Sequence, residues 1–172
     1  MNRVLWLLAA LSLAAPARAL STTVQIPGTD VTFDLPAGFV RMPDDIRKLK
    51  YARGTPPQVV YSTPGPSWAV NIAFALSPRP LPGGHVQAFQ QQAERTFKAV
   101  PGVQWVGSDC RTVAGRQWCS VRFWIPGLDA PIYNDLRSTL VGGKLLLVTA
   151  NASEARYPQD KAQLKAALDS LR

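Results

Sequence analysis

The feature that most constrains the fold is the stretch CRTVAGRQWC, which holds both cysteines of the chain, Cys110 and Cys119. Ala114-Gly115 at its centre fits the two-residue loop of a β-hairpin. Counting outward from that loop places Cys110 opposite Cys119, at a non-hydrogen-bonded site where Cα atoms approach to about 4.5 Å. A disulfide accepts that separation, so we predict a hairpin cross-linked by Cys110–Cys119 in an oxidising compartment.

Two other interpretations of the cysteine pair compete with a structural disulfide. Cysteines of a redox-active pair usually lie closer in sequence and at the start of a helix, so this alternative is the weaker one. A structural zinc site needs four ligands, and the chain offers one histidine, His85, and no second cysteine pair. We therefore expect no metal and no cofactor.

The N-terminal residues have the composition of a secretory signal peptide. Arg3 gives a positive start, residues 4–15 are almost uninterruptedly apolar, and 17–19 form a small-residue cleavage motif. The apolar run is shorter than the ~20 residues that span a bilayer, so an uncleaved membrane helix is the weaker interpretation. We predict a signal peptide at 1–19 and a single domain at 20–172, located in the periplasm and without a transmembrane segment.

The chain is basic, with 19 Lys and Arg against 11 Asp and Glu and a formal net charge of +8. Such an excess attracts acidic proteins and anionic polymers or lipids. The basic residues are scattered, however, and the basic stripe with interleaved aromatic residues that is typical of nucleic-acid binding is missing. The expected partner is therefore another envelope protein or an anionic envelope component, and not nucleic acid.

Hydrophobic periodicity and turn residues predict the order of elements along the chain. We expect strands at 23–26 and 31–35, a short helix at 44–49, strands at 58–62 and 68–75, a helix at 86–100, four strands between 103 and 151, and a helix at 157–171. Residues 77–84 are rich in proline and should form a surface connector outside any ladder or helix. The short turns between the last four strands predict an antiparallel meander, and hence an α+β fold with a largely antiparallel sheet and flanking helices.

This order, ββαββαββββα, resembles that of the PsbP-like family, whose fold is an α/β/α sandwich. The phrases VTFDLPAGF at 31–39 and LVGGKLLLVT at 140–149, with the helix at 164–171, are similar to those of the family. The family is named after an accessory protein of photosystem II and includes DcrB-type bacterial envelope proteins. The resemblance implies a non-catalytic binding or accessory role and supplies no catalytic motif.

The residues themselves also carry no recognisable catalytic motif. There is no G-x-S-x-G sequence, and His85 has no neighbour in sequence that would orient it as a base. The acids Asp44, Asp45, Asp129 and Asp135 stand at turns or helix starts, where acids are expected structurally. We predict a protein that is not an enzyme. A periplasmic hydrolase with a non-local active site and an immunity protein against a secreted toxin remain as alternatives.

The strand at 116–125 separates its side chains into two rows by parity. One row is mostly apolar, and the other is basic and aromatic. If the second row faces solvent, it is a surface of the kind enriched at protein interfaces. If helices cover both faces of the sheet, its tryptophans belong to the core, with arginine stems packed over them. The candidate partner-binding residues are Arg111, Arg116, Trp118, Arg122 and Trp124.

Overall fold

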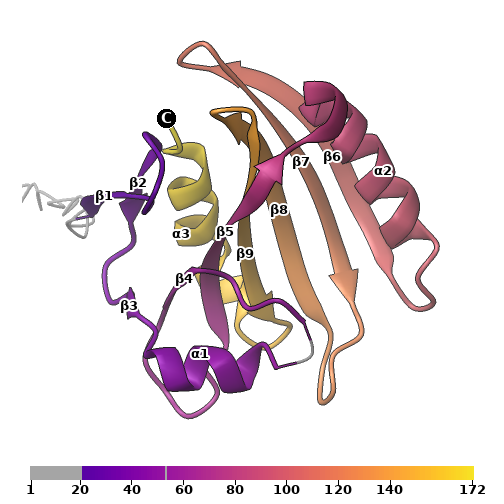
Figure 1. Cartoon of the computed structure of the whole chain (residues 1–172). Coiled ribbons are helices and arrows are strands. Elements are labelled where there is room, and N and C mark those ends of the chain that lie inside the picture. The colour runs from indigo at the N-terminus through magenta and orange to yellow at the C-terminus, as the bar shows by residue number, and fades with distance from the viewer. Residues whose placement is uncertain (1–20, 53) are drawn as a thin grey trace, which may run out of the picture.

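The computed structural model describes residues 21–52 and 54–172, so the predicted signal peptide at 1–19 lies outside the described residues (Figure 1). In chain order the elements are β1 (Thr22–Gln25), β2 (Thr32–Leu35), β3 (Val40–Arg41), α1 (Asp44–Lys50), β4 (Val59–Ser62), β5 (Val70–Pro80), the 3₁₀ helix η1 (Pro82–Gly84), α2 (Val86–Lys98), β6 (Gln104–Val113), β7 (Arg116–Ile125), β8 (Ile132–Val141), β9 (Lys144–Ser153) and α3 (Tyr157–Asp169). The predicted α+β class and element order are confirmed, with the short elements β3 and η1 added.

Seven of the strands form one antiparallel sheet in the order β3-β4-β5-β9-β8-β7-β6, and β1 and β2 form a separate hairpin. The predicted meander runs from β6 to β9, each strand pairing with the next. β9 then pairs with β5 along most of its length. Strands from the two halves of the chain therefore meet in the middle of the sheet.

Helices cover both faces of this sheet (Figure 1). α2 packs against β6, β7 and β8 on one face, whereas α3 packs against β9 and β5 on the other, beside the β1–β2 hairpin. α1 lies on the α2 face, where Ile46 and Tyr51 pack against Val60 and Ala73. The predicted α/β/α sandwich is confirmed, although α3 covers only part of its face.

The main core lies between the sheet and α3. Every second residue of β5 points into it, namely Val70, Ile72 and Phe74, as a strand with one face in a core requires. α3 contributes Leu164 and Leu168, one helical turn apart and at most 3% exposed. This apolar contact fixes α3 over β5 and β9.

The sequence of α3 favours a helix from its first turn onward. Pro158 stands in that turn, where a missing backbone N–H costs little. Asp160, an acid near the positive end of the helix dipole, accepts a hydrogen bond from Arg156 at 2.9 Å. Lys161 and Lys165 follow at a spacing of four and are exposed. Both lysines therefore lie on one side of the helix.

The cysteine hairpin forms as predicted. Cys110 is paired with Cys119 in the β6–β7 register, and a disulfide joins them with a Cα–Cα distance of 4.0 Å. The loop residues Ala114 and Gly115 have φ values of 50° and 76°. Both are in the left-handed region, as the type I′ turn of a two-residue hairpin requires.

The expectation that residues 77–84 lie outside any ladder or helix is wrong for most of this segment, because β5 extends to Pro80 and residues 82–84 form η1. After a register shift beyond Leu76, Pro80 pairs with Lys144 of β9. The pairing of β4 with β5 ends at Phe74, so the last residues of β5 have a strand neighbour on one side only. Proline is tolerated in such an edge segment, since its missing N–H need not be a ladder donor.

Candidate functional site

The part of the sheet that α3 leaves open is the candidate site. On the α3 side, the helix packs mainly over β9 and β5 and reaches the side chains of β6, β7 and β8 only near its two ends, while α2 covers the opposite face of these strands. A cavity of about 530 Å³ lies between α3 and this open part of the sheet. A second cavity of about 300 Å³ adjoins it near the C-terminal end of α3, and Arg122, Arg137 and Lys165 line both. We call the two cavities together the α3 groove.

Apolar and aromatic side chains form most of the wall of the larger cavity. They are Val106, Tyr133, Ala150, Tyr157, Ala162, Leu164 and Leu168. Burial raises the pKa of Tyr133 far above its ordinary value, so this phenol is neutral at any physiological pH.

An aromatic cluster stands where β7, β8 and the start of α3 meet. The ring centroids of Tyr133 and Tyr157 are 4.1 Å apart, and Trp124 packs edge-on against both at 5.3 and 5.1 Å. Two of its members, Tyr133 and Tyr157, line the larger cavity. Edge-to-face contacts of this kind give the rings defined orientations, so this part of the groove wall is preformed.

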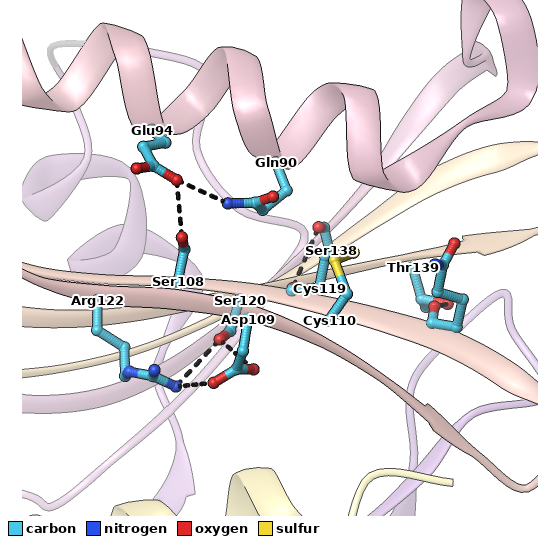
Figure 2. Close-up of a disulfide and its surroundings, with 11 residues drawn as sticks. Gln90, Glu94, Ser108, Asp109, Cys110, Cys119, Ser120, Arg122, Ser138 and Thr139 are labelled. Atoms are coloured by element: carbon cyan, nitrogen blue, oxygen red, sulfur yellow. Dashed lines mark hydrogen bonds and ion pairs between the residues drawn. A yellow bond between two sulfur atoms is a disulfide. The ribbon is translucent and has the colours of Figure 1, made fainter.

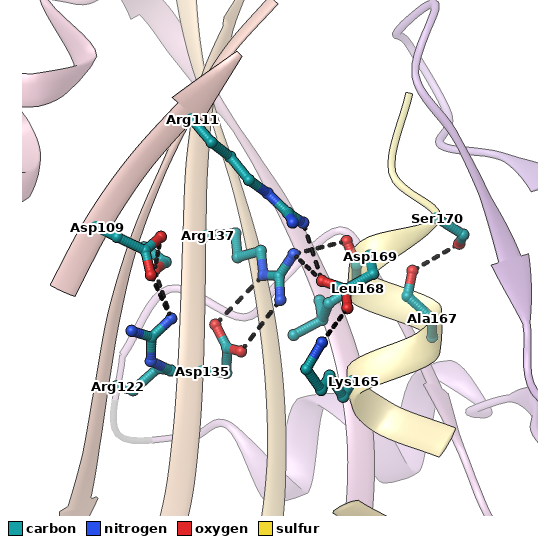
Figure 3. A network of polar contacts seen from close by, with 11 residues as sticks. Asp109, Arg111, Arg122, Asp135, Arg137, Lys165, Ala167, Leu168, Asp169 and Ser170 are labelled. Carbon is teal, nitrogen blue, oxygen red and sulfur yellow. Dashed lines mark hydrogen bonds and ion pairs between the residues drawn. The ribbon is translucent and has the colours of Figure 1, made fainter. Parts of the chain in front are cut away.

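A buried ion-pair network ties β8 to α3 (Figure 3). The guanidinium of Arg137, 9% exposed, contacts the carboxylate of Asp135 at 3.4 Å and that of Asp169 at 3.0 Å. It also donates a hydrogen bond to the carbonyl oxygen of Leu168 at 2.9 Å. Arg137 thereby satisfies a carbonyl in the last turn of α3 and holds that turn against the sheet.

Three cations share the single carboxylate of Asp169 (Figure 3). Besides Arg137, Arg111 of β6 reaches it at 2.9 Å and Lys165 of α3 also forms an ion pair with it. Burial alone would raise the pKa of Asp169, but hydrogen bonds from Lys165 and Arg137 outweigh it and lower the pKa to about 2. Burial dominates at Asp135, whose pKa is raised although Arg137 lies beside it.

A second, more exposed ion pair lies on β6 and β7 (Figure 2). Arg122 contacts Asp109 at 2.8 Å, and the hydroxyl of Ser120 donates to the same carboxylate at 2.9 Å. The Cys110–Cys119 disulfide lies on the α2 side of these strands, near Ser138, and fixes their spacing from the opposite face. The arginine and the acid are therefore presented on a rigid hairpin.

The charges of the α3 groove do not balance. The five bases are Arg111, Arg122, Arg137, Lys161 and Lys165, and the three acids are Asp109, Asp135 and Asp169. Five bases against three acids leave a surplus of two positive charges. Lys161 forms no ion pair within residues 21–52 and 54–172. The groove is thus an apolar cavity with a positive rim.

The sequence matches no protein-family model and no curated protein. Among solved structures, the chain is similar to cyanobacterial PsbP (CyanoP) from Synechocystis, with a TM-score of 0.58 and 14% identity over 94% of this chain and 96% of that one. The chain has the PsbP-like fold. LpqN of Mycobacterium tuberculosis, described as involved in cell envelope biogenesis, gives a TM-score of 0.57 at 16% identity over 88% and 89% of the two chains. The Ran-binding protein Mog1p of Saccharomyces cerevisiae gives 0.55 at 12% over 90% and 95%.

Within this PsbP-like fold, the predicted partner-binding residues are not all at one place. Arg111 and Arg122 line the α3 groove, and Trp124 is half-buried in the aromatic cluster at its edge. Arg116 lies apart at the hairpin turn, where it forms an ion pair with Asp30 at 2.7 Å. That these residues contact a partner stays a prediction.

Trp118 lines the smaller cavity of the α3 groove but does not face solvent. Its side chain is 3% exposed and belongs to the main core. At this end of β7, the layer formed by the β1–β2 hairpin and the end of α3 packs over the row of side chains that includes Trp118. The alternative interpretation, in which a helical layer buries the tryptophan, holds for Trp118.

Sequence reasoning missed the residues that β8 and α3 bring to the groove. The sequence leads us to expect Asp135 at a turn or helix start, but it lies buried in the middle of β8. Tyr133, Asp135 and Arg137 alternate along this strand, and a charged pair at period two in a covered strand signals a polar site. Lys161 and Lys165 resemble an ordinary solvated helix face, and no feature of the sequence sets them apart.

The structure gives no catalytic arrangement to His85. It stands at the start of α2, outside the α3 groove, and no hydrogen bond joins it to another side chain in the described part of the chain. Residues 21–52 and 54–172 hold no group of three or more His, Cys, Asp or Glu side chains placed to bind a metal ion. They also form no helix that is both long and apolar enough to cross a membrane.

Proposed function

We propose that this chain is an exported, non-catalytic binding or accessory protein of the bacterial cell envelope, which contacts another envelope protein through the α3 groove. The observation that carries the proposal is the open sheet face beside α3. It combines a preformed apolar cavity with a positive rim, and recognition sites commonly join an apolar centre to a few placed polar groups. Val106, 53% exposed on β6, extends this apolar surface to solvent.

Export is supported by two independent features. The composition of residues 1–19 is that of a signal peptide, and the Cys110–Cys119 disulfide needs an oxidising compartment to persist. The likeness to LpqN, whose printed description places it in envelope biogenesis, and to a Ran-binding protein is compatible with a binding role on this fold. Fold alone does not assign a function, so the groove carries the argument.

The chemistry of the groove favours binding over hydrolysis. An arginine contacts each groove carboxylate at 2.8 to 3.4 Å, and this positive charge disfavours protonation of the acid and so weakens it as a general base. Ser120 donates its hydroxyl hydrogen bond to Asp109, which Arg122 already neutralises. These contacts hold the groove in shape and leave no activated nucleophile in it.

Site-specific crosslinking in the native envelope tests the proposal. A photo-crosslinking amino acid replaces Val106 at the groove, and a matched chain carries it at Leu49 of α1, which is 77% exposed and outside the groove. We expect one reproducible protein adduct from position 106 and none from position 49. A partner identified as a toxin would specify the immunity function. Adducts at 49 alone, or none at 106, would refute binding of an envelope protein through the groove.

A further inference from the structure

We propose that the α3 groove recognises an acidic segment of the partner, with one apolar or aromatic side chain inserted into the larger cavity and flanking carboxylates placed against Lys161 and Arg122. This inference rests on the proposed function and adds the chemistry of the occupant. It follows from the juxtaposition of an apolar cavity and an uncompensated positive rim on the same edge of α3.

The cavity has the size and lining of an anchor site. Its volume of about 530 Å³ exceeds that of a single large side chain, and its wall includes Tyr157, Leu164 and Val106. Sites with such linings hold apolar groups, and interface anchors typically fill such pockets. The anchor enters from the open side of β6 to β8, since the opposite wall is the packed core.

The rim selects the charge of the segment that carries the anchor. Asp169 is shared by three cations, so it cannot neutralise all of them, and Lys161 has no acid partner in the described part of the chain. A carboxylate brought to this rim completes these pairs near an apolar wall, where water screens the charges poorly. A basic segment would instead face the surplus of positive charge and be repelled.

The ion pair between Arg111 and Asp169 limits how far the occupant extends. It spans from β6 to the end of α3 at 2.9 Å, and neither residue lines the larger cavity (Figure 3). Both residues line the smaller cavity, so the bridge between sheet and helix crosses that part of the groove, beyond the space that receives the anchor. A bridge in that position suits an inserted side chain better than a chain that runs along the whole groove.

Selection from a displayed library of random seven-residue peptides tests the proposal on the exported, oxidised protein. We expect enrichment of sequences in which Asp or Glu flanks Leu, Phe or Trp. A selected peptide, synthesised and labelled, should bind roughly tenfold more weakly to the Lys161→Glu variant, because rim charge contributes to such encounters. Lys48→Glu on α1 is the matched control for net charge, and its affinity should be unchanged.

The cavity itself is tested by filling it. Ala162 is exposed on α3 and lines the cavity, so Ala162→Trp should block the anchor and weaken peptide binding roughly tenfold or more without disturbing the core. Ala166→Trp, four residues further along the exposed side of the helix and outside both cavities, should bind as the unchanged protein does.

Enrichment of basic or purely apolar peptides, or equal binding to Ala162→Trp and Ala166→Trp, would overturn the inference. A lipid competitor gives a further outcome that would overturn the inference. Lysophosphatidylglycerol, added below its micelle-forming concentration, would then displace the selected peptide and reduce its binding equally in the unchanged protein and in all four variants. The proposed function fails separately: a protein adduct at Val106 with no acidic enrichment refutes the occupant only, whereas acidic enrichment with no adduct refutes the envelope-protein partner only.

Discussion

Arg137 joins β8 to the last turn of α3 through one planar side chain. It pairs with Asp135 and Asp169 and also donates to the carbonyl of Leu168. A buried pair of this kind adds little over a well-packed apolar substitute, but removal of one member leaves an uncompensated charge. The arginine therefore contributes to stability mainly by neutralising carboxylates that would otherwise be buried with an uncompensated charge.

We predict that Arg137→Met lowers the free energy of unfolding by about 3 kcal/mol, because Asp135 then stays buried without its cation. Urea denaturation followed by circular dichroism measures the loss. Arg122→Met is the control, since its pair with Asp109 is half-exposed and should be worth about 1 kcal/mol or less. Equal losses in the two variants would contradict the role assigned to burial.

The sign of the pH dependence follows from Asp135. Burial raises the pKa of this acid in the folded state above its unfolded value, so protonation favours the folded state and ionisation opposes it as the pH rises. In Arg137→Met, the carboxylate of Asp135 is still buried but the positive charge of Arg137 beside it is gone. The deficit of Arg137→Met should therefore shrink as the pH is lowered toward 4.

For single residues, the sequence was sufficient to predict contacts between positions that are close along the chain. The pairing of Cys110 with Cys119 could be counted from a two-residue loop, because hairpin register depends only on neighbouring residues. The contact of Arg137 with Asp169 could not, since it joins residues 32 apart through the packing of a helix on a sheet. The burial of Trp118 has the same origin.

The β6–β7 hairpin is the element that holds Arg111, Arg122 and Asp109 at the groove. Its disulfide packs against side chains on the α2 side of the sheet and constrains the two strands at the smaller cavity, which both cysteines line. Closing a loop of about ten residues reduces the entropy of the unfolded chain, which stabilises the fold by roughly 2 to 3 kcal/mol.

Reduction of the disulfide should lower the unfolding free energy by that amount, roughly 2 to 3 kcal/mol, when denaturation is compared with and without a thiol-free reductant. The control is the chain carrying Cys110→Ala and Cys119→Ala, whose stability should not respond to the reductant. If the protein isolated without reductant contained as many free thiols as the denatured, reduced protein, the disulfide would not form.

Prolines misled the prediction for one element. The rule that proline ends a ladder holds for a strand with neighbours on both sides, and β5 lacks a neighbour on one side beyond Phe74. Which strand edge is free depends on the order β4-β5-β9, which is a property of the assembled sheet. The alternation of Val70, Ile72 and Phe74, by contrast, was a local signal and held.

The order of helices and strands was sufficient to predict the sandwich as a whole, because the periodicities of the long elements are clear. It was not sufficient to predict the α3 groove. That site exists because α3 sits over β5 and β9 and leaves β6 to β8 open, an offset set by how Leu164 and Leu168 pack against the sheet. Lateral placement of a helix leaves no pattern in the sequence.

Processing of the whole chain gives a further prediction. Protein recovered from the envelope should begin at Leu20, and its intact mass should equal that of residues 20–172 less the hydrogens lost in disulfide formation. Intact-mass spectrometry before and after reduction measures both. Recovery of a chain that starts at Met1 would rule out cleavage, and a mass that does not change on reduction would rule out the disulfide.

The insertion of β9 between β5 and β8 has a consequence for the timing of folding. The central ladder pairs Val70 with Ala152 and Phe74 with Val148, and the backbone of Arg172 exchanges hydrogen bonds with Thr32. Contacts between residues so far apart slow folding, because the chain must close long loops before they form. A chain of which only the first half has been synthesised lacks β9, so β5 has no partner on that side, and we expect the sheet to close only after the last strand has been made.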